Sequence, residues 1–288
     1  MLVSCKADPS FVGGNEVLFS GSEDWMSNLP DETKVVNMVI PGTHDSCANY
    51  DFLGLSSTAA TQDLTLPEQL NAGVRCFDIR IYDDNGVYKI HHGPQYMHMT
   101  LDEVISTFSS FLAEHPSEFI ILLSMGEYKT DVKGVTGILE SFIEEEPSLW
   151  YMGSGLDSSV RLSDLRGKIV GGLRYRDSSR SSCLDTSTYV EKGVVYRTTD
   201  VSSSYEEALS YLEETRESVL SSLNVSFLSC YFEGQFGIPN IRICSSFINP
   251  RLSLYLSVFE GTGENLGVIV TDHISRSLSR TIYMCNAF

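Results

Sequence analysis

Ionisable residues recur in this sequence at the ends of short apolar runs. "MVIPGTHDSC" spans residues 38–47, and "CFDIRIYDDNGVYKIHHG" spans residues 76–93. A buried strand gains no stability from ionisable residues at its end. A reactive site, by contrast, needs polar groups that rigid elements hold close together at one end of the fold. We therefore predict a catalytic cluster. The residues at these strand ends are His44, Asp45, Asp78, Arg80, His91 and His92, followed later in the chain by Glu127, Arg174, Asp272 and His273.

Two histidines, a carboxylate and an arginine form a general acid–base set for phosphate esters. A neutral imidazole can remove a proton from an attacking hydroxyl while an imidazolium protonates the leaving oxygen, and each role accelerates a reaction by about 10²–10⁴-fold. A guanidinium group matches the planar charge of phosphate oxygens. This chemistry requires no metal, and Arg80 lies on a strand where a metal site would need another acid.

Apolar strand-like runs alternate with amphipathic segments from Trp25 onward, as in repeated βα units. We predict helices at 64–72, 100–116, 135–148, 204–223 and 249–259, and the helix at 100–116 begins with a Thr100–Glu103 capping box. The predicted strands are 34–40, 73–82, 87–92, 118–126, 168–175, 225–232 and 266–274. The pattern favours a closed or nearly closed βα barrel, in which the carboxyl ends of the strands form the active-site face.

The composition narrows the class of protein. The net charge of −18, with no basic tract, argues against a nucleic-acid partner, and 42% hydrophobic residues are enough for a substantial core. The seven cysteines contain no C-x-x-C pair, so neither a zinc knuckle nor a redox motif is expected. Cys47, Cys76, Cys230 and Cys244 lie in apolar runs and are predicted to be core residues.

Residues 1–24 are predicted to be a flexible lead-in, and residues 25–288 a single domain. "LVSC" at 2–5 resembles the lipobox of bacterial lipoproteins, in which the cysteine is lipidated, and a polar tether would then follow Cys5. The alternative, a chance tetrapeptide in a frayed terminus, stays open. On the first alternative the protein is secreted or is a cell-envelope lipoprotein.

Six motifs resemble the X-domain of bacterial phosphatidylinositol-specific phospholipase C, in the same order, over roughly residues 25–288. This resemblance implies an α/β fold, an irregular and incompletely closed TIM-like barrel. It also implies metal-independent cleavage of phosphatidylinositol, and often of glycosyl-phosphatidylinositol anchors, to diacylglycerol and inositol 1,2-cyclic phosphate. The motifs are "IPGTHDS" (40–46), "EQLNAGVRCFDIR" (68–80), "HHGPQYMHMTLDEV" (91–104), "HPSEFIILLSMGEY" (115–128), "LRGKIVGGLRY" (165–175) and "GVIVTDHIS" (267–275).

The resemblance also implies catalytic roles. His44 is the expected general base that deprotonates the inositol 2-hydroxyl, and Asp272 orients it. His92 is the expected general acid for the diacylglycerol oxygen and is coupled to Asp45. Arg80 stabilises the charge on the phosphorus-bound oxygens.

Three further residues, Asp78, Arg174 and Asp200, match positions of the inositol pocket. Where bacterial relatives often have two lysines before Glu-Tyr, this chain has Met125 and Gly126, so a basic inositol contact is missing.

Two alternatives remain open: a non-catalytic inositol-lipid-binding module, and a metal-dependent glycerophosphodiester phosphodiesterase. On the favoured interpretation the partner is membrane phosphatidylinositol, bound peripherally by a monomer, with no cofactor and no metal.

Three other histidines are predicted to be structural and not catalytic. His98 is expected at the surface, His115 at a helix C-terminus, and His273 on the strand face opposite the site.

Overall fold

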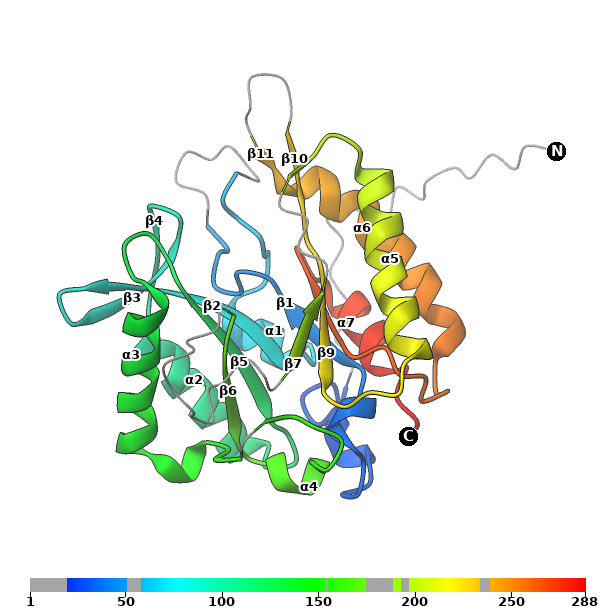
Figure 1. The fold of residues 1–288 in the computed structure, drawn as a ribbon, viewed down its shortest axis with the longest axis horizontal. Helices are drawn as coiled ribbons and strands as arrows, with labels where there is room; N and C mark the ends of the chain where they lie inside the picture. The colour runs from blue at the N-terminus through cyan, green and yellow to red at the C-terminus, as the bar shows by residue number, and fades with distance from the viewer. Residues whose placement is uncertain (1–19, 51–57, 154, 175–188, 193–196, 234–238) are drawn as a thin grey trace.

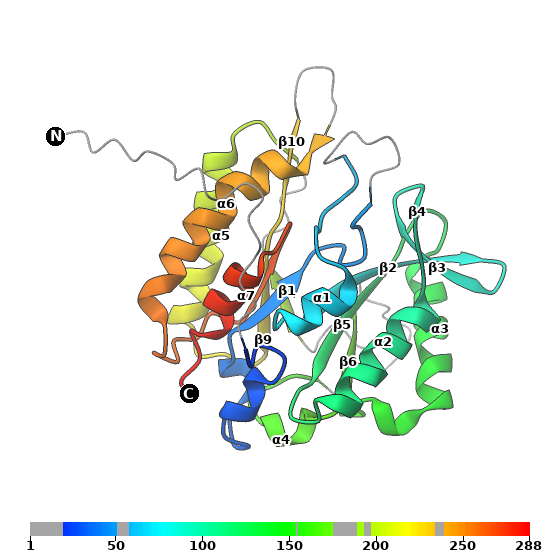
Figure 2. The same cartoon turned by 180° about the vertical axis from the view of Figure 1, so that it is seen from behind.

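The computed structural model describes residues 20–50, 58–153, 155–174, 189–192, 197–233 and 239–288. Helices surround a curved sheet: α2 and α3 cover one flank, and α5 and α6 lie side by side on the opposite flank (Figures 1 and 2). The helices are α1 (Leu66–Asn71), α2 (Leu101–Glu114), α3 (Val132–Glu145), α4 (Leu162–Leu165), α5 (Val201–Glu217), α6 (Ile241–Leu256) and α7 (Arg276–Tyr283).

Seven parallel strands form an incomplete barrel in the order β6-β5-β2-β1-β12-β9-β7. No pairing between β6 and β7 occurs in the described part of the chain, so hydrogen bonds do not close the barrel there. The fold is therefore the TIM-like, incompletely closed α/β barrel predicted from the sequence. The barrel strands are β1 (Ile40–Thr43), β2 (Cys76–Asp84), β5 (Ile120–Gly126), β6 (Ile169–Leu173), β7 (Tyr189–Lys192), β9 (Leu223–Leu228) and β12 (Val268–Thr271).

The remaining strands extend the barrel wall at its mouth. β3 (Val87–His92) and β4 (Gln95–Thr100) form an antiparallel meander with the long strand β2. Ile81 pairs with Ile90, so β3 runs back toward the barrel and returns His92 to the level of the mouth. A separate small sheet is formed by β8 (Arg197–Thr198), β10 (Tyr231–Glu233) and β11 (Pro239–Asn240).

Alternation along the strands separates two cores. Side chains of one parity point into the barrel and those of the other parity pack under the helices, because successive residues of a strand face opposite sides. On β2, Cys76 belongs to the inner cluster, whereas Phe77 and Ile79 belong to the outer one, where Phe77 packs on Phe108 of α2 at 4.9 Å. The inner cluster also contains Ile40, Ile121, Leu123, Val170, Val225, Phe227, Val268 and Val270.

Gly42 allows the first strand to fit between its neighbours. A Cβ atom at this position would lie 2.9 Å from Val270 Cγ2 and 3.2 Å from Cys76 Cβ. Any larger side chain in the "IPGTHDS" motif would therefore push β1 away from β12 and β2. The glycine keeps the tips of these three strands close together.

Local signals explain where the predicted element boundaries were right and wrong. The Thr100–Glu103 capping box is present, and α2 begins directly after it. The helix predicted at 204–223 begins earlier, because Asp200 accepts hydrogen bonds from the N–H groups of Ser202 and Ser203, and it ends at Glu217. Val219 is fully exposed.

Three other predicted boundaries also changed. The helix predicted from residue 249 begins at Ile241, with Asn240 as its N-cap. The run at 34–40 contains a 3₁₀ turn, Val35–Asn37, before β1, and the run at 225–232 divides into β9 and β10. The third predicted strand is antiparallel, not a βα unit.

Within the segment predicted to be a lead-in, the described residues 20–24 contact the rest of the fold. Ser22 is buried, and its hydroxyl lies 2.8 Å from the hydroxyl of Tyr283. Trp25 stacks on the same tyrosine ring at 5.3 Å. Cys5 and its predicted lipidation lie outside the described residues. The four cysteines predicted to be core residues are buried and free.

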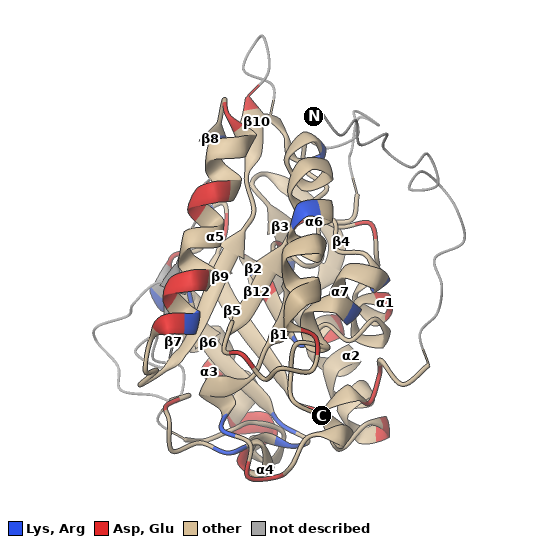
Figure 3. Ribbon diagram, turned by 90° about the vertical axis from the view of Figure 1, so that its right-hand side faces the viewer, with Lys and Arg blue, Asp and Glu red and all other residues tan. Residues whose placement is uncertain are grey.

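The acidic excess lies on the outside of the molecule. Figure 3 shows acidic positions along the outward side of α5, and the glutamates of that helix are largely exposed. Because the surface charge is acidic, binding of an anion would depend on particular arginines at the mouth of the barrel and not on the overall charge.

In the part of the chain that the structure describes, no helix has the length and apolar character needed to cross a membrane.

Candidate active site

The polar cluster continues the inward-facing rows of the barrel strands. The row that begins with Cys76 goes on through Asp78 to Arg80, and the row that begins with Val268 ends at Asp272. Each row is apolar deep in the barrel and ionisable at the mouth. The same parity places His44 two residues after Gly42 and Arg174 four residues after Val170.

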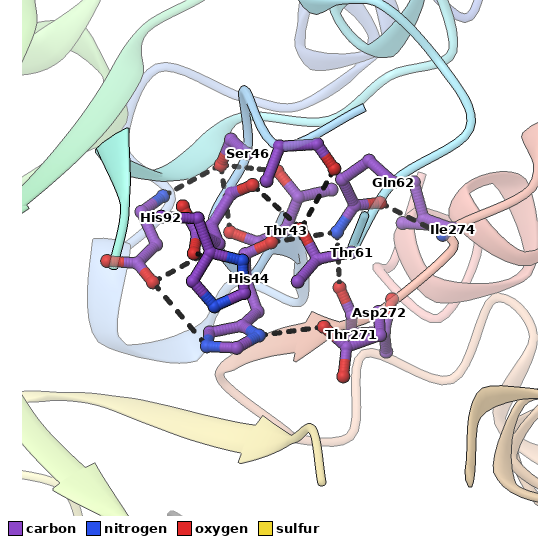
Figure 4. A network of polar contacts seen from close by, with 12 residues as sticks. Thr43, His44, Ser46, Thr61, Gln62, His92, Thr271, Asp272 and Ile274 are labelled. Carbon is purple, nitrogen blue, oxygen red and sulfur yellow. Dashed lines mark hydrogen bonds and ion pairs between the residues drawn. The ribbon is translucent and has the colours of Figure 1, made fainter. Parts of the chain in front are cut away.

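His44 is held between two partners that fix its tautomer. Its Nδ1 lies 2.7 Å from Oδ1 of Asp272, and its Nε2 lies 2.6 Å from Nη2 of Arg80. A carboxylate only accepts hydrogen bonds and a guanidinium only donates them. The proton of the neutral ring therefore resides on Nδ1, and the lone pair of Nε2 faces the mouth. Figure 4 shows the imidazole of His44 joined to the carboxylate of Asp272.

His92 has a different set of partners. Its Nδ1 lies 2.6 Å from the carbonyl oxygen of Ala59 and 3.4 Å from Oδ2 of Asp45. Since the carbonyl oxygen accepts, Nδ1 of His92 carries a proton. A proton donor at Nε2 would require the cationic form of the ring.

Asp45 reaches the mouth through an unusual backbone turn. Its φ of 44° lies in the left-handed region, so Asp45 turns inward although it directly follows His44. Its N–H donates to Oδ2 of Asp78 at 3.0 Å. The Asp45 carboxylate, fully buried, lies 3.4 Å from both Arg80 Nη1 and His92 Nδ1. Asp45 thus connects the two histidines through Arg80.

Arg80 lies at the centre of three carboxylates. Its guanidinium contacts Asp45 at 3.4 Å, Asp78 at 3.5 Å and Glu127 at 3.2 Å. Burial alone would lower the pKa of Arg80, but these carboxylates raise it above its usual value. Arg80 is therefore permanently charged and occupies the place between the acids where a cation would bind. Within the described residues, no three His, Cys, Asp or Glu side chains form a metal-ligating group.

Asp78 and Arg174 form the second half of the pocket. Nη1 of Arg174 lies 3.1 Å from Oδ2 of Asp78, and its guanidinium stacks 4.2 Å above the ring of Phe227. Burial would raise the pKa of Asp78, but Arg174, Arg80 and His44 outweigh it and lower this pKa to about 2. Asp78 is thus an anion at any physiological pH, above an apolar floor.

Several buried polar atoms at the mouth have no hydrogen-bond partner among the described residues. They include both carboxylate oxygens of Asp45, Oδ1 of Asp78 and Nε of Arg80. Buried polar groups without partners are uncommon in folded proteins and are expensive to keep. Their concentration beside two histidines is typical of a site that a ligand or water completes.

The structure brings together all but one of the eight residues to which the resemblance gave a role. Asp200 is the exception: its exposed carboxylate caps α5 and bonds to Ser202 and Ser203, and none of its hydrogen bonds joins the cluster. An N-cap position explains this aspartate without any role in substrate binding.

The histidines given structural places also differ in detail from the predictions. His98 is exposed, as predicted. His115 is the C-cap of α2, where its Nδ1 lies 2.8 Å from Asp24. His273 is not on a strand, because β12 ends at Thr271; it has a φ of 46° and lies 3.4 Å from Asp63.

Two contributors to the site had been given no role from the sequence. Glu127, named in the predicted cluster from its position directly after β5, contacts Arg80. Gln62 hydrogen-bonds the backbones of the two loops that carry His44 and Asp272. No sequence pattern marks Gln62, because its place depends on a loop that folds back over β1.

Comparisons with known proteins relate part of this chain to one family. The family model described as phosphatidylinositol-specific phospholipase C, X domain, matches residues 38–171. Over these residues, slightly less than half of its length, the chain is similar to that X domain.

Among curated proteins, the chain is 33% identical over 155 residues to the 1-phosphatidylinositol phosphodiesterase of Listeria monocytogenes. That alignment covers 52% of this chain and 48% of the relative. The Staphylococcus aureus (strain Newman) enzyme of the same name is 32% identical over 165 residues, 54% of this chain and 52% of the relative. The chain thus spans about half the length of the curated relatives it matches.

The similarity of the folds extends farther than the similarity of the sequences. The solved phosphatidylinositol-specific phospholipase C of Listeria monocytogenes superposes with a TM-score of 0.78 at 25% identity, over 93% of this chain and 99% of that one. A solved Staphylococcus aureus phosphatidylinositol-specific phospholipase C superposes with a TM-score of 0.79, over 95% of this chain and 100% of that one. Its sequence identity is 22%, so this match supports the fold alone. The barrel of the Listeria monocytogenes structure therefore matches nearly the whole chain.

Proposed function

We propose that this protein is a phosphatidylinositol-specific phospholipase C that cleaves phosphatidylinositol by general acid–base catalysis without a metal. The observation that carries the proposal is the fixed tautomer of His44, whose unprotonated Nε2 faces a mouth that also holds His92 and two arginines. A neutral base and a cationic acid on one mouth are what an intramolecular phosphoryl transfer requires.

The proposed reaction proceeds in one transfer step. Nε2 of His44 takes the proton of the inositol 2-hydroxyl, and that oxygen attacks the phosphorus. The bond from phosphorus to the diacylglycerol oxygen breaks, and Nε2 of His92 donates its proton to this leaving oxygen. The products are diacylglycerol and inositol 1,2-cyclic phosphate.

Arg80 must change partner during this reaction. In the structure its Nη2 is hydrogen-bonded to Nε2 of His44, whose lone pair must accept the proton of the 2-hydroxyl. A bound phosphate offers the guanidinium stronger acceptors than a neutral ring nitrogen does. The substrate would therefore draw Arg80 away from His44 and expose the base at the moment when the phosphate is bound.

Two features support an inositol lipid as the substrate and a reaction that needs no metal ion. Asp78 can accept hydrogen bonds from inositol hydroxyls, and Phe227 provides an apolar floor beneath them. The three acids that could have held a cation instead surround Arg80. Peripheral binding to a membrane and a secreted or cell-envelope location remain parts of the proposal.

Phosphorus NMR of phosphatidylinositol micelles incubated with the protein in EDTA tests this function. A cyclic inositol phosphate signal is the expected result. Intact lipid whose cleavage begins only when a divalent cation is added would favour the metal-dependent phosphodiesterase. Intact lipid under both conditions would overturn cleavage of phosphatidylinositol, and a glycosylated anchor would then be the next substrate.

A further inference from the structure

Gln62 joins the two loops that carry His44 and Asp272. It is 1% exposed, and its Nε2 donates to the carbonyl oxygen of His44 at 2.9 Å and to that of Thr271 at 3.0 Å. Its Oε1 accepts from the N–H of Ile274 at 3.2 Å. Figure 4 shows this amide between the ends of β1 and β12, next to the His44–Asp272 pair.

The orientation of this amide is forced by its neighbours. Both carbonyl oxygens only accept hydrogen bonds, so the atom that faces them must be the NH₂ group. The backbone N–H of Ile274 only donates, so the carboxamide oxygen must face it. Both hydrogens and one lone pair of a single side chain are thereby used to connect two loops.

The two loops need such a connection because each turns sharply at the catalytic position. Thr43 and Thr271 are paired in register, and the last ladder hydrogen bond runs from the N–H of His44 to the carbonyl of Thr271 at 3.1 Å. Directly beyond it, Asp45 and His273 both take left-handed φ values, 44° and 46°. Such conformations persist only where surrounding contacts hold them.

Thr61, next to Gln62, reinforces this bridge. Its hydroxyl donates to the carbonyl of Asp45 at 2.9 Å, and its carbonyl accepts from the N–H of His273 at 2.5 Å. Each left-handed residue is thus bonded to the same short segment. Of the described residues, however, only Gln62 is hydrogen-bonded to the carbonyl of His44 itself, so its removal would release the catalytic residue directly.

We propose that Gln62 is a positioning residue that fixes the alignment of the His44 and Asp272 side chains. This inference rests on the proposed function, in which that pair forms the general base. A displacement of a catalytic group by about 1 Å can cost about 10²-fold in rate. Releasing the two loops should therefore lower kcat and leave the contacts that bind the substrate in place.

The test compares Gln62→Met with a matched control, Asn286→Leu. Methionine has a similar length and shape but none of the three hydrogen bonds. Asn286 is also buried and also makes three such bonds, to the N–H and carbonyl of Val39 and the carbonyl of Tyr283. Val39 lies at the opposite end of β1, about 17 Å from His44 along the strand.

We expect kcat for Gln62→Met to fall by about 10- to 100-fold with KM changed less than about twofold. The downfield Nδ1 proton resonance of His44, identified by its loss in His44→Ala, should shift or broaden. Asn286→Leu should keep both kcat and this resonance, although both variants lower the urea midpoint. If Gln62→Met does not fold, Gln62→Asn, which keeps the amide but is one methylene shorter, should show the same two changes.

An unchanged resonance with a normal kcat in the Gln62 variants would overturn the inference. So would an equal loss of kcat in Asn286→Leu, because the effect would then reflect general stability. The resonance is measured without substrate, so it tests the positioning role even if the wild-type protein fails to cleave phosphatidylinositol. Such a failure would refute the proposed function alone.

Discussion

Replacing Arg80 by lysine separates the charge of this residue from its shape. The guanidinium contacts Nε2 of His44 through Nη2, and Asp45 and Glu127 through Nη1. Lysine keeps the unit charge but ends in a single ammonium group, which cannot occupy both positions of the fork. Methionine removes charge and fork together.

The contact distances give the expected magnitudes. At the 3.2–3.5 Å that separate Arg80 from its three carboxylates, each pair has a gross attraction of about 5 kcal/mol at an effective dielectric constant of about 20. Breaking a buried pair by removing one partner costs about 3–5 kcal/mol net. Arg80→Met should therefore lower the free energy of unfolding by about 3–5 kcal/mol, and Arg80→Lys by about 1 kcal/mol. Loss of a donor that stabilises transition-state charge should lower kcat about 10²–10³-fold in both variants.

Urea denaturation measures the first quantity, and release of cyclic inositol phosphate measures the second. Arg166→Lys is the control, because Arg166 also forms a fork, to Asp31 and the carbonyl of Leu29, away from the mouth. That variant should keep the wild-type kcat. If Arg80→Lys retained kcat within about tenfold of the wild type, the role of the fork in transition-state stabilisation would be refuted.

Three further predictions follow from other contacts. His44→Ala and His92→Ala should each abolish turnover while circular dichroism and the urea midpoint stay near wild-type values; near-wild-type turnover in either would contradict the acid–base assignment. Asp78 has a pKa lowered from 3.8 to about 2, so its stabilising charge is present above pH 4 and is lost as the pH falls toward 2. The destabilisation caused by Asp78→Asn, measured with urea, should therefore shrink by about 2 kcal/mol between pH 6 and pH 2, and a constant difference would argue against the Arg174 pairing. Glu118 lies 2.9 Å from buried Arg75 beneath the barrel, so Glu118→Ala should lower the free energy of unfolding measured with urea by about 3–5 kcal/mol and leave KM unchanged.

Much of the candidate site could be predicted from local sequence. Strand parity alone puts Asp78 and Arg80 on the same side as Cys76, and it puts Asp272 on the same side as Val268. The expectation that ionisable residues at strand ends meet at one mouth needed only the parallel arrangement of the strands. That arrangement follows from runs that are apolar on both faces.

Other parts depended on contacts that no local pattern specifies. His92 reaches the mouth because β3 runs antiparallel to β2, although a parallel strand was expected. Asp45 turns inward only through its left-handed backbone, and strand parity would have pointed it outward. Asp200 resembled a pocket residue by alignment, yet it caps a helix.

The sequence by itself therefore determined which residues carry the chemistry and which face of each strand they occupy, because a strand's two-residue period is a local property of the backbone. The tertiary structure decided which of them touch. His44 acquires a defined tautomer only when Asp272, some 228 positions away in sequence, and Arg80 meet its two nitrogens. Gln62 becomes part of the site only when its loop folds back between β1 and β12. Such contacts join distant segments, and their energies exist only once the barrel has formed.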